Sequence, residues 1–254
     1  MKVIILAGGL GTRLSEETLL KPKPMVEIGG FPILWHIMKI YSYYGFNEFV
    51  IALGYKGNII KEYFLNYSDR YSDLTIDFTN NKITKHQKMK EDWVINLVST
   101  GSDSLTGKRI KKSMEFVGNE RVLMTYGDGL SNINLKDLID FHISNKKLAT
   151  LTAVRPSARY GELSFNENLI NKFKEKPQAG EGWINGGFFV LEPEISEYIN
   201  DDEPFEGAPL EKLSSEGQLG GYKHKGFWQS MDVIRDKNLL QNLWEQNKAP
   251  WKIW

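Results

Sequence analysis

A glycine-rich run followed by two cations is the part of this sequence whose residue types most clearly suggest chemistry. Gly8, Gly9 and Gly11 come directly after a short apolar run. Glycines let a backbone approach a phosphate closely and turn its N–H groups toward the phosphate oxygens. Arg13 can bind phosphate through two nitrogens at once, and Lys23, with a proline on each side, can present its ammonium at a defined place. The pattern indicates a site for a phosphate-bearing ligand.

Two familiar phosphate-binding motifs do not account for this run. A Walker A loop requires Gly-Lys followed by Ser or Thr, whereas Gly11 is followed here by Thr12 and Arg13. A dinucleotide fingerprint requires a third glycine at the place that Leu14 occupies. The plain alternative is a turn after a strand, followed by solvated lysines, but Arg13 and the proline-flanked Lys23 favour the functional interpretation.

Two aspartates are candidates for holding a divalent cation. Asp128 follows the apolar run Val122–Tyr126 and lies between two glycines, and Asp232 opens the last helical pattern of the chain. Mg²⁺ prefers one or two carboxylates together with phosphate oxygens and waters. The structural alternatives are an Asp-Gly turn at Asp128 and a helix N-cap at Asp232, although a cap does not consume both carboxylate oxygens.

Composition limits the classes of protein to which the chain can belong. Lys plus Arg equals Asp plus Glu at 32 each among 254 residues, whereas a general nucleic-acid-binding protein would carry a basic excess. Cys is absent, which excludes disulfides, thiolate metal sites and cysteine nucleophiles. No segment approaches the roughly 20 apolar residues that span a bilayer. We expect a cytoplasmic protein that binds neither nucleic acid nor membranes.

Short apolar runs alternate with helical patterns along the chain, which predicts an α/β fold. The predicted strands are Lys2–Ala7, Phe49–Leu53, Val122–Tyr126, Ala149–Val154 and Phe188–Leu191. The predicted helices are Pro32–Tyr44, which Gly45 ends, Leu135–Asn145, and a third that contains Val233, Leu240, Leu243 and Trp244. The sheet should be mainly parallel and covered on both faces, with the glycine run and Asp128 at its carboxyl edge, where ligands bind.

Two stretches interrupt this alternation. Asp73–Leu97 alternates polar and apolar residues around the turn-like pair Asn80-Asn81, and we interpret it as an antiparallel ribbon inserted into or edging the sheet. Short extended pieces also run from Gly161 to Phe173. Because no repeat or low-complexity linker divides the chain, residues 1–254 are predicted to form a single domain with insertions.

Two stretches near the N-terminus carry a resemblance to a known family. Gly8–Leu14 and Lys21–Met25 look like the signature of sugar-1-phosphate nucleotidyltransferases, and the resemblance extends across essentially the whole chain. Within the family the chain is most similar to glucose-1-phosphate cytidylyltransferases, through Pro32–Met38, Gly54–Gly57, Thr125–Gly129, Ile184–Val190, Gly226–Gln229 and Lys248–Lys252. The resemblance implies a Rossmann-like, mainly parallel mixed sheet flanked by helices, with antiparallel ribbon insertions.

The resemblance also implies an activity and its residues. The expected reaction joins CTP to a sugar 1-phosphate, glucose 1-phosphate first, and releases pyrophosphate, with Mg²⁺ as cofactor. The implied catalytic residues are Arg13, Lys23, Asp128 and Asp232, of which the two aspartates are the metal ligands. The implied nucleotide contacts are Leu6, Ala7, Gly8, Gly9, Gly11, Thr12, Arg13, Lys23, Ser104, Thr106, Gly107, Arg109, Gly127 and Asp128. The implied sugar phosphate contacts are Tyr126, Gly161, Glu175, Lys176, Asn185, Gly186, Trp228 and Asp232.

The expectation of CTP depends on residues 100–109. Thymidylyltransferases carry a Gln-Pro stretch ending in Gly-Leu-Ala at about this place, whereas this segment is rich in Ser and Thr and looks like the cytidylyltransferase form. A polar turn before a basic helix is the plain alternative. One segment departs from the closest relatives, because Pro204–Leu210 stands where they usually carry a tryptophan-containing, more acidic stretch. A sugar other than glucose is therefore an open alternative.

Two other functions fit parts of the sequence. A nucleotide-sugar-dependent glycosyltransferase of similar topology would need an Asp-x-Asp motif, and Gly127-Asp128-Gly129 lacks the second carboxylate. A non-catalytic sensor of nucleotides or sugar phosphates would not need both aspartates and Lys23. Because such relatives are typically oligomeric, we expect a homo-oligomer in which Trp251 and Trp254 pack onto a neighbouring subunit.

Overall fold

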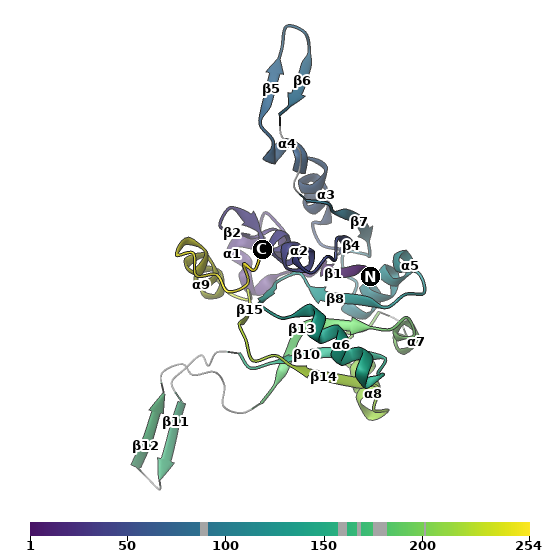
Figure 1. The fold of residues 1–254 in the computed structure, drawn as a ribbon, viewed down its shortest axis with the longest axis vertical. Helices are drawn as coiled ribbons and strands as arrows, with labels where there is room; N and C mark the ends of the chain where they lie inside the picture. Colours follow the sequence, from purple (N-terminus) through teal and green to yellow (C-terminus); the bar gives the residue numbers. More distant parts are fainter. Residues whose placement is uncertain (87–90, 157–161, 167–168, 175–181, 201) are drawn as a thin grey trace.

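The computed structural model describes residues 1–86, 91–156, 162–166, 169–174, 182–200 and 202–254 (Figure 1). Its centre is a seven-stranded sheet with the strand order β14-β10-β13-β8-β1-β4-β7. In that order, the strands span Leu219–Lys223, Ala149–Val154, Ile184–Leu191, Val122–Tyr126, Val3–Ala7, Glu48–Leu53 and Val94–Ser99. The five strands predicted from the sequence are present, and β14 is an addition that the sequence did not predict.

The sheet is mainly parallel. Each neighbouring pair of strands runs in parallel except the two pairs that β13 makes, with β8 and with β10. A strand that is covered on both faces reads as a continuous apolar run, and β1 is buried along its whole length. The predicted α/β fold, a mainly parallel mixed sheet flanked by helices, is confirmed.

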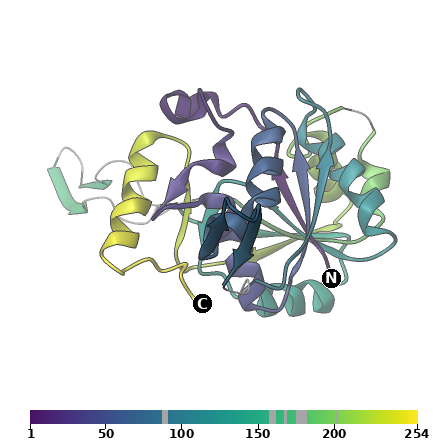
Figure 2. The same ribbon diagram turned by 90° about the horizontal axis from the view of Figure 1, so that it is seen from above.

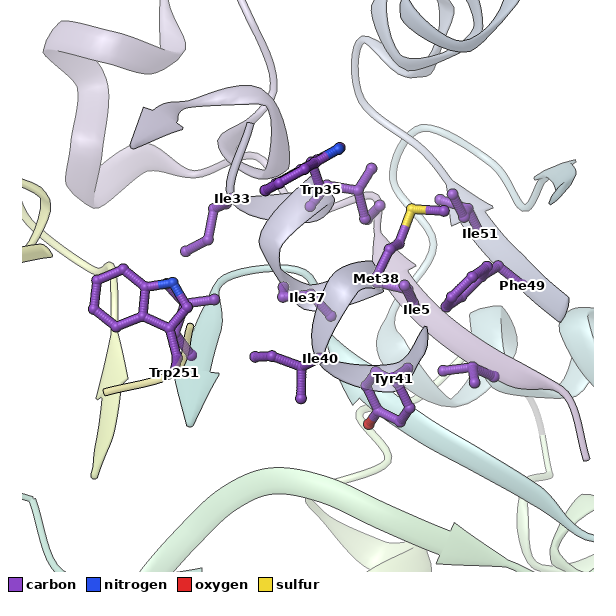
Figure 3. Close-up of a cluster of buried hydrophobic side chains, with 14 of the residues drawn as sticks. Ile5, Ile33, Trp35, Ile37, Met38, Ile40, Tyr41, Phe49, Ile51 and Trp251 are labelled. Carbon is purple, nitrogen blue, oxygen red and sulfur yellow. The ribbon is translucent and has the colours of Figure 1, made fainter. Parts of the chain in front are cut away.

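The first of two hydrophobic cores lies on the sheet face that α2 (Ile33–Tyr43) covers (Figure 3). Buried side chains of this helix, among them Ile37 and Met38, pack in the same core as Ile5 of β1 and Phe49 of β4. The helix ends at Gly45, as predicted, because φ of +85° at that residue favours glycine.

The second core fills the opposite face, between the sheet and α5 (Thr106–Val117), α7 (Ile195–Tyr198) and α8 (Ala208–Ser215). Successive residues of a strand point to opposite faces, so Ile4 belongs to this core and Ile5 to the first. Figure 2, which views the molecule from above, shows helices on both sides of the sheet. The prediction that both faces are covered is confirmed.

The remaining elements are short or lie at the periphery. They are two 3-10 turns (Thr12–Leu14 and Lys23–Met25), α1 (Ser15–Thr18), α3 (Gly57–Leu65), α4 (Tyr67–Tyr71), α6 (Leu135–Asn145), α9 (Ile234–Glu245), and the strand pairs β2 with β3 (Glu27–Ile28, Phe31–Pro32) and β9 with β15 (Gly129–Ser131, Trp228–Ser230). α6 and α9 confirm the second and third predicted helices. None of the helices in the described part of the chain is long and apolar enough to cross a membrane.

The ribbon predicted over Asp73–Leu97 is shorter than expected. β5 (Leu74–Asp77) and β6 (Lys82–Lys85) form an antiparallel ribbon around Asn81, whose φ is 50°, and it projects from the sheet in Figure 1. The prediction was wrong for β7, which pairs parallel with β4. As an edge strand β7 is only partly buried, so its residue pattern imitates a ribbon. β11 (Glu162–Asn166) and β12 (Leu169–Lys174) form the second predicted ribbon.

The C-terminal tryptophans contact other residues of the same chain, and the prediction that they pack onto a neighbouring subunit was wrong for Trp251 and stays a prediction for Trp254, which is partly exposed. Trp251 is fully buried and stacks on Phe227, with 5.6 Å between the ring centroids. Trp254 packs edge-on against Trp35. Aromatic rings in a short tail can bury their area against their own chain or another one, and the sequence alone does not distinguish these cases.

A buried histidine connects this tail to α2. His36 Nε2 donates to the carbonyl oxygen of Ile28 at 2.8 Å, because Nδ1 accepts the hydrogen bond that Trp251 Nε1 donates. Burial lowers the pKa of His36 from its ordinary value of 6.5 to about 4, since the charged ring would be removed from water. The folded chain therefore holds His36 in its neutral form.

His36 should make the folded chain sensitive to mild acid. Because its pKa is depressed on folding, its contribution is complete above the unfolded value of 6.5 and is lost as the pH falls toward 4. Between about pH 7.5 and about pH 5, we expect the free energy of unfolding to fall by about 2 kcal/mol through His36, measured by urea denaturation. His36→Gln should flatten this dependence, whereas His86→Gln, at an exposed position, should retain it. If the free energy of unfolding depended on pH equally in wild type and in both variants, this role of His36 would be contradicted.

Candidate active site

A cavity of about 760 Å³ opens at the carboxyl ends of β1 and β8. Small-molecule sites span roughly 300–1,000 Å³. Among the residues predicted to bind substrates, the cavity is lined by Leu6, Gly8, Gly9, Gly11, Thr12, Arg13, Lys23, Ser104, Thr106, Arg109, Tyr126, Gly127, Asp128, Asn185, Gly186, Trp228 and Asp232. Ala7 and Gly107 are not part of this lining, and Gly161, Glu175 and Lys176 lie outside the described residues.

The Lys23 ammonium lies between the two predicted metal ligands. Its Nζ donates to Asp128 Oδ2 at 2.6 Å and to Asp232 Oδ1 at 2.9 Å. Burial by itself would lower the pKa of Lys23, but the charges and hydrogen bonds of both aspartates outweigh it and raise the pKa above its ordinary value. Burial would raise the pKa of Asp232, but the contacts with Lys23 hold it below its ordinary value. Lys23 and Asp232 are therefore both charged at neutral pH.

A single tight turn fixes the position of this lysine. Lys23–Met25 form one turn of 3-10 helix, and the backbone is extended on either side of it, at Pro22 (φ −68°, ψ 152°) and at Val26 (φ −70°, ψ 131°). Pro24 is buried against Gly127, where an added Cβ would lie 2.9 Å from the proline ring. This close packing carries Lys23 to the end of β8.

Asp232 does not cap the last helix, contrary to the structural alternative for it. α9 begins two residues later, and the carboxylate that accepts the backbone N–H groups of Asp232 and Val233 belongs to Asp236. An acidic residue in the first turn can reach back to the preceding N–H groups in this way. The carboxylate of Asp232 is left to face the cavity, where Ser230 Oγ donates to its Oδ2 at 2.8 Å.

Arg13 stands at the mouth of the cavity. Its Nη2 is 3.2 Å from Asp232 Oδ1, and its side chain is 74% exposed. An ion pair this exposed contributes little to stability. Gly11, with φ of +66°, turns the chain into the short helix that carries Arg13, and a Cβ at this glycine would lie 3.0 Å from Thr18. Arg13 is therefore able to exchange its contact with Asp232 for the phosphate of a ligand.

Arg109 holds the glycine run from behind and is only 3% exposed. Its guanidinium donates to five acceptors: Leu53 O, Thr100 Oγ1 and Gly101 O from Nη1, and Gly8 O and Ser102 O from Nη2. A Cβ added at Gly8 would lie 2.2 Å from this group, and one added at Gly54 would lie 2.3 Å from it. The terminal nitrogens of Arg109 thus bind the protein itself, and its contact with a nucleotide stays a prediction.

The segment expected to face the base is anchored at the start of α5. Ser104 Oγ donates to a backbone carbonyl oxygen of its own segment, and Thr106 Oγ1 donates to Glu206 Oε2 at 2.6 Å. A Cβ added at Gly107 would lie 2.7 Å from the carbonyl oxygen of Glu203. Because Gly107 packs against the backbone behind it, it supports the cavity wall without lining it.

The described part of the expected sugar side is built around Tyr126. Its hydroxyl donates to Glu206 Oε1 at 2.5 Å and accepts from Asn185 Nδ2 at 3.3 Å. Burial raises the pKa of this phenol, and the Glu206 carboxylate raises it further. Trp228 Nε1 donates to Gly186 O at 2.7 Å. These side chains bind one another, which fixes their positions before a ligand arrives.

Among the cavity-lining residues that were not predicted from the sequence, Glu206 and Ser230 form side-chain hydrogen bonds with predicted site residues. Glu206 lies in the segment Pro204–Leu210, which the sequence distinguished only as a departure from relatives. Its partners Thr106 and Tyr126 are 100 and 80 residues away, so no local pattern connects them. Ser230 orients Asp232, and its hydroxyl two residues before a predicted ligand was the only available signal.

Asp128 and Asp232 can hold a divalent cation between them. β9 pairs with β15, so the chain after Asp128 lies beside the chain before Asp232. Both carboxylates already share one cation, the Lys23 ammonium. Within the described ranges, no group of three or more His, Asp or Glu side chains could enclose a metal. Two carboxylates suit Mg²⁺ when phosphate oxygens and waters complete its shell, so these residues fit that ion.

Arg109→Ala should destabilise the chain, because it leaves buried carbonyl oxygens without donors and opens a void beside Gly8 and Gly54. We expect the free energy of unfolding in urea to fall by about 3 kcal/mol or more. Glu115→Ala, at an exposed position of the same helix, should change it by less than about 0.5 kcal/mol. If the two variants were equally stable, Arg109 would not be what holds the glycine run.

Comparison with known proteins connects this site to a family. The sequence pattern of the family described as nucleotidyl transferase matches residues 2–233. The chain is 52% identical to the glucose-1-phosphate cytidylyltransferase of Salmonella typhimurium strain LT2 and 44% identical to the probable glucose-1-phosphate cytidylyltransferase of Bacillus subtilis strain 168. Each alignment spans 256 residues and covers 100% of both chains.

Solved structures share the fold. UDP-glucose pyrophosphorylase complexed with UDP-glucose matches with a TM-score of 0.69 at 17% identity, over 97% of this chain and 98% of that one. HddC from Yersinia pseudotuberculosis matches with a TM-score of 0.67 at 25% identity, over 96% of this chain and 99% of that one. The family pattern and the full-length relatives agree with the geometry of the cavity: this chain belongs to the nucleotidyl transferase family.

Proposed function

We propose that the chain transfers a cytidylyl group from CTP to α-D-glucose 1-phosphate, forming CDP-glucose and pyrophosphate. The observation that carries this proposal is the Lys23 ammonium in contact with Asp128 and Asp232 inside a cavity of nucleotide size. The full-length similarity to glucose-1-phosphate cytidylyltransferases supports the choice of substrates. The departure at Pro204–Leu210 leaves another sugar or polyol phosphate as the alternative.

The reaction needs alignment and charge neutralisation more than proton transfer. A phosphate oxygen of the sugar phosphate attacks the α-phosphorus of CTP in line, a new P–O bond forms, and the bond to the β-phosphate breaks. The nucleophile is already an anion, and the electron pair of the broken bond leaves with pyrophosphate. Arg13 and Lys23 are the cations that would offset charge on the triphosphate and stabilise the transition state.

Asp128 and Asp232 are the residues that would hold Mg²⁺. When bound, the ion would neutralise phosphate charge and increase the electrophilicity of the α-phosphorus. Ser230 and Asp236 support this role from outside, because they bind the carboxylate and the backbone N–H of Asp232. Lys23 balances the charges of the two aspartates, together with Arg13, which contacts Asp232, and this keeps both carboxylates together.

The sugar end of the site is proposed from the resemblance and from the described wall of the cavity. Lys176 would neutralise the 1-phosphate and Glu175 would accept from a sugar hydroxyl, and both belong, with Gly161, to the part of the chain outside the described residues. Asn185 and Trp228 lie on the described wall. For the base, Ser104 and Thr106 are the proposed contacts.

A pyrophosphate-release assay tests the proposal. The chain is incubated with Mg²⁺ and each of the common nucleoside triphosphates, against a panel of sugar 1-phosphates. We expect CTP with glucose 1-phosphate to give the highest kcat/KM. A glycosyltransferase would instead release a nucleoside diphosphate from a nucleotide sugar, and a sensor would bind without turnover, so either result would replace the proposed function.

Lys23→Ala should lower kcat by about 100-fold or more, because it removes a cation from the transition state. Lys21→Ala is the matched control. It lies two residues away, where its Nζ is 3.8 Å from Glu27, and we expect near-normal turnover. Steady-state kinetics with CTP and glucose 1-phosphate measures both variants. Near-normal kcat in Lys23→Ala would refute its catalytic assignment.

We also propose that the chain forms a homo-oligomer through the β5–β6 ribbon. Ile76 and Ile83 are cross-strand partners on one face of this ribbon and are 52% and 63% exposed, and Phe78, in the turn that follows β5, is 90% exposed. Apolar side chains that gather at an exposed surface mark sites of association. A second copy of the chain is the proposed partner.

Ile76→Lys should therefore reduce the molar mass measured by multi-angle light scattering across a dilution series, since a charge would be buried on association. Thr84→Lys, on the other face of the ribbon, should leave the mass unchanged. A wild-type chain that is monomeric at all concentrations would exclude the homo-oligomer.

The single domain over residues 1–254 and the cytoplasmic location stay proposals made from the sequence.

A further inference from the structure

The segment 202–206, which we call the α5 strap, closes the N-terminal end of α5. Asp202 Oδ1 accepts from Leu105 N at 2.6 Å, and the carbonyl oxygen of Glu203 accepts from Gly107 N at 2.9 Å. The first N–H groups of a helix have no partner within the helix, so the strap supplies acceptors for them. Phe205 anchors the strap by its fully buried ring.

Glu206 is at the end of this strap and lines the cavity. Its two carboxylate oxygens accept from different walls, Oε1 from the Tyr126 hydroxyl and Oε2 from Thr106 Oγ1. A carboxylate has about four acceptor positions, so two hydrogen bonds leave about two for a ligand. The residue as a whole is exposed, so these positions are open to the cavity.

The hydrogen bonds that Glu206 accepts from Tyr126 and Thr106 do not by themselves explain why this residue is negatively charged. A glutamine would accept from one of these hydroxyls through its amide oxygen and donate to the other through its amide nitrogen, so it would hold the same two partners without a charge. A carboxylate repels phosphate, and the proposed substrates bring two polyanions into this cavity. In the described structure Lys23 and Arg13 contact Asp128 and Asp232. The carboxylate of Glu206 is therefore suited to a neutral part of a substrate that carries several hydrogen-bond donors.

Tyr126 indicates which part of the substrate this is. Its ring is confined by Gly187, where an added Cβ would lie 2.6 Å from it, and packs edge-on against Phe189 at 5.9 Å. Its hydroxyl joins Glu206 to Asn185, which belongs to the proposed sugar side. A pyranose carries several hydroxyl donors, whereas cytosine carries one amine and the ribose of CTP carries two hydroxyls. The position and the acceptor capacity of Glu206 both favour the sugar.

We propose that the Glu206 carboxylate accepts hydrogen bonds from hydroxyl groups of the sugar 1-phosphate and so determines which sugar the enzyme accepts. This inference depends on the proposed function. A site built to bind a hydroxyl rejects an analogue without it strongly, because the buried acceptor is then left unpaired. Glu206 would thus accept a hydrogen bond directly from a sugar hydroxyl, while Tyr126 and Thr106 hold the Glu206 carboxylate in position.

The test compares Glu206→Ala, Glu206→Gln and a control, Asp202→Ala, which loosens the strap at a residue outside the cavity lining. Each chain is assayed with CTP and with glucose 1-phosphate or its 2-, 3-, 4- and 6-deoxy analogues. We expect Glu206→Ala to lower kcat/KM for glucose 1-phosphate about 10-fold or more, with the KM for CTP within about 2-fold of wild type. Glu206→Gln, which keeps the framework, should show a smaller loss.

The deoxy analogues distinguish a direct contact between Glu206 and the sugar from a purely structural role of Glu206. One analogue lacks the hydroxyl that donates to Glu206. Its kcat/KM should be about 10-fold lower than that of glucose 1-phosphate in wild type, and nearly equal to it in Glu206→Ala. The assignment would be overturned if the deoxy analogue lowered kcat/KM equally in wild type and in Glu206→Ala, or if Asp202→Ala showed the same kinetics as Glu206→Ala. It would also be overturned if Glu206→Ala, assayed in addition with UTP, changed the preference between CTP and UTP. If the wild-type chain releases no pyrophosphate from CTP with any of the sugar phosphates, the proposed function itself fails.

Discussion

The candidate site depends on one arrangement of charge, an ammonium held between two carboxylates that come from distant parts of the chain. Lys23 is 105 residues from Asp128 and 209 residues from Asp232. Two carboxylates that face one small volume repel each other or take up a proton unless a cation lies between them. The turn that carries Lys23, the end of β8 and the β9–β15 pair are the elements that bring the three groups together.

Two cations of the site, the buried Arg109 and the partly buried Lys23, have different partners and different consequences. Arg109 binds neutral carbonyl and hydroxyl oxygens, so its charge stiffens the loops behind the cavity. Lys23 balances two acids, so it adds little net positive potential. With a formal net charge of zero, the chain has no strong field to attract a polyanion from a distance. Attraction at short range must come from Arg13 and from the backbone N–H groups of the glycine run.

The sequence predicts those parts of the site that follow a buried strand directly. The glycine run and Asp128 lie where predicted because β1 and β8 are continuous apolar runs that end at a glycine. Prediction was less complete where two explanations share one pattern. Asp232 could have been a cap, and only the structure shows that Asp236 takes that role. The partly buried edge strand β7 was mistaken for a ribbon. Glu206 joins segments far apart in sequence, and no local pattern reports such a contact.

The guanidinium of Arg109 between Gly8 and Gly54 has a consequence for how this chain can change over generations. A side chain at either glycine would overlap the guanidinium, which would have to give up hydrogen bonds to move, and losing the arginine leaves both glycines with an empty volume. The effects of substitutions at these three positions should therefore be non-additive, because each one changes the space available at the other two. Gly54 lies in a separate loop from the glycine run, and the two loops are coupled through the side chain of Arg109, which belongs to neither of them.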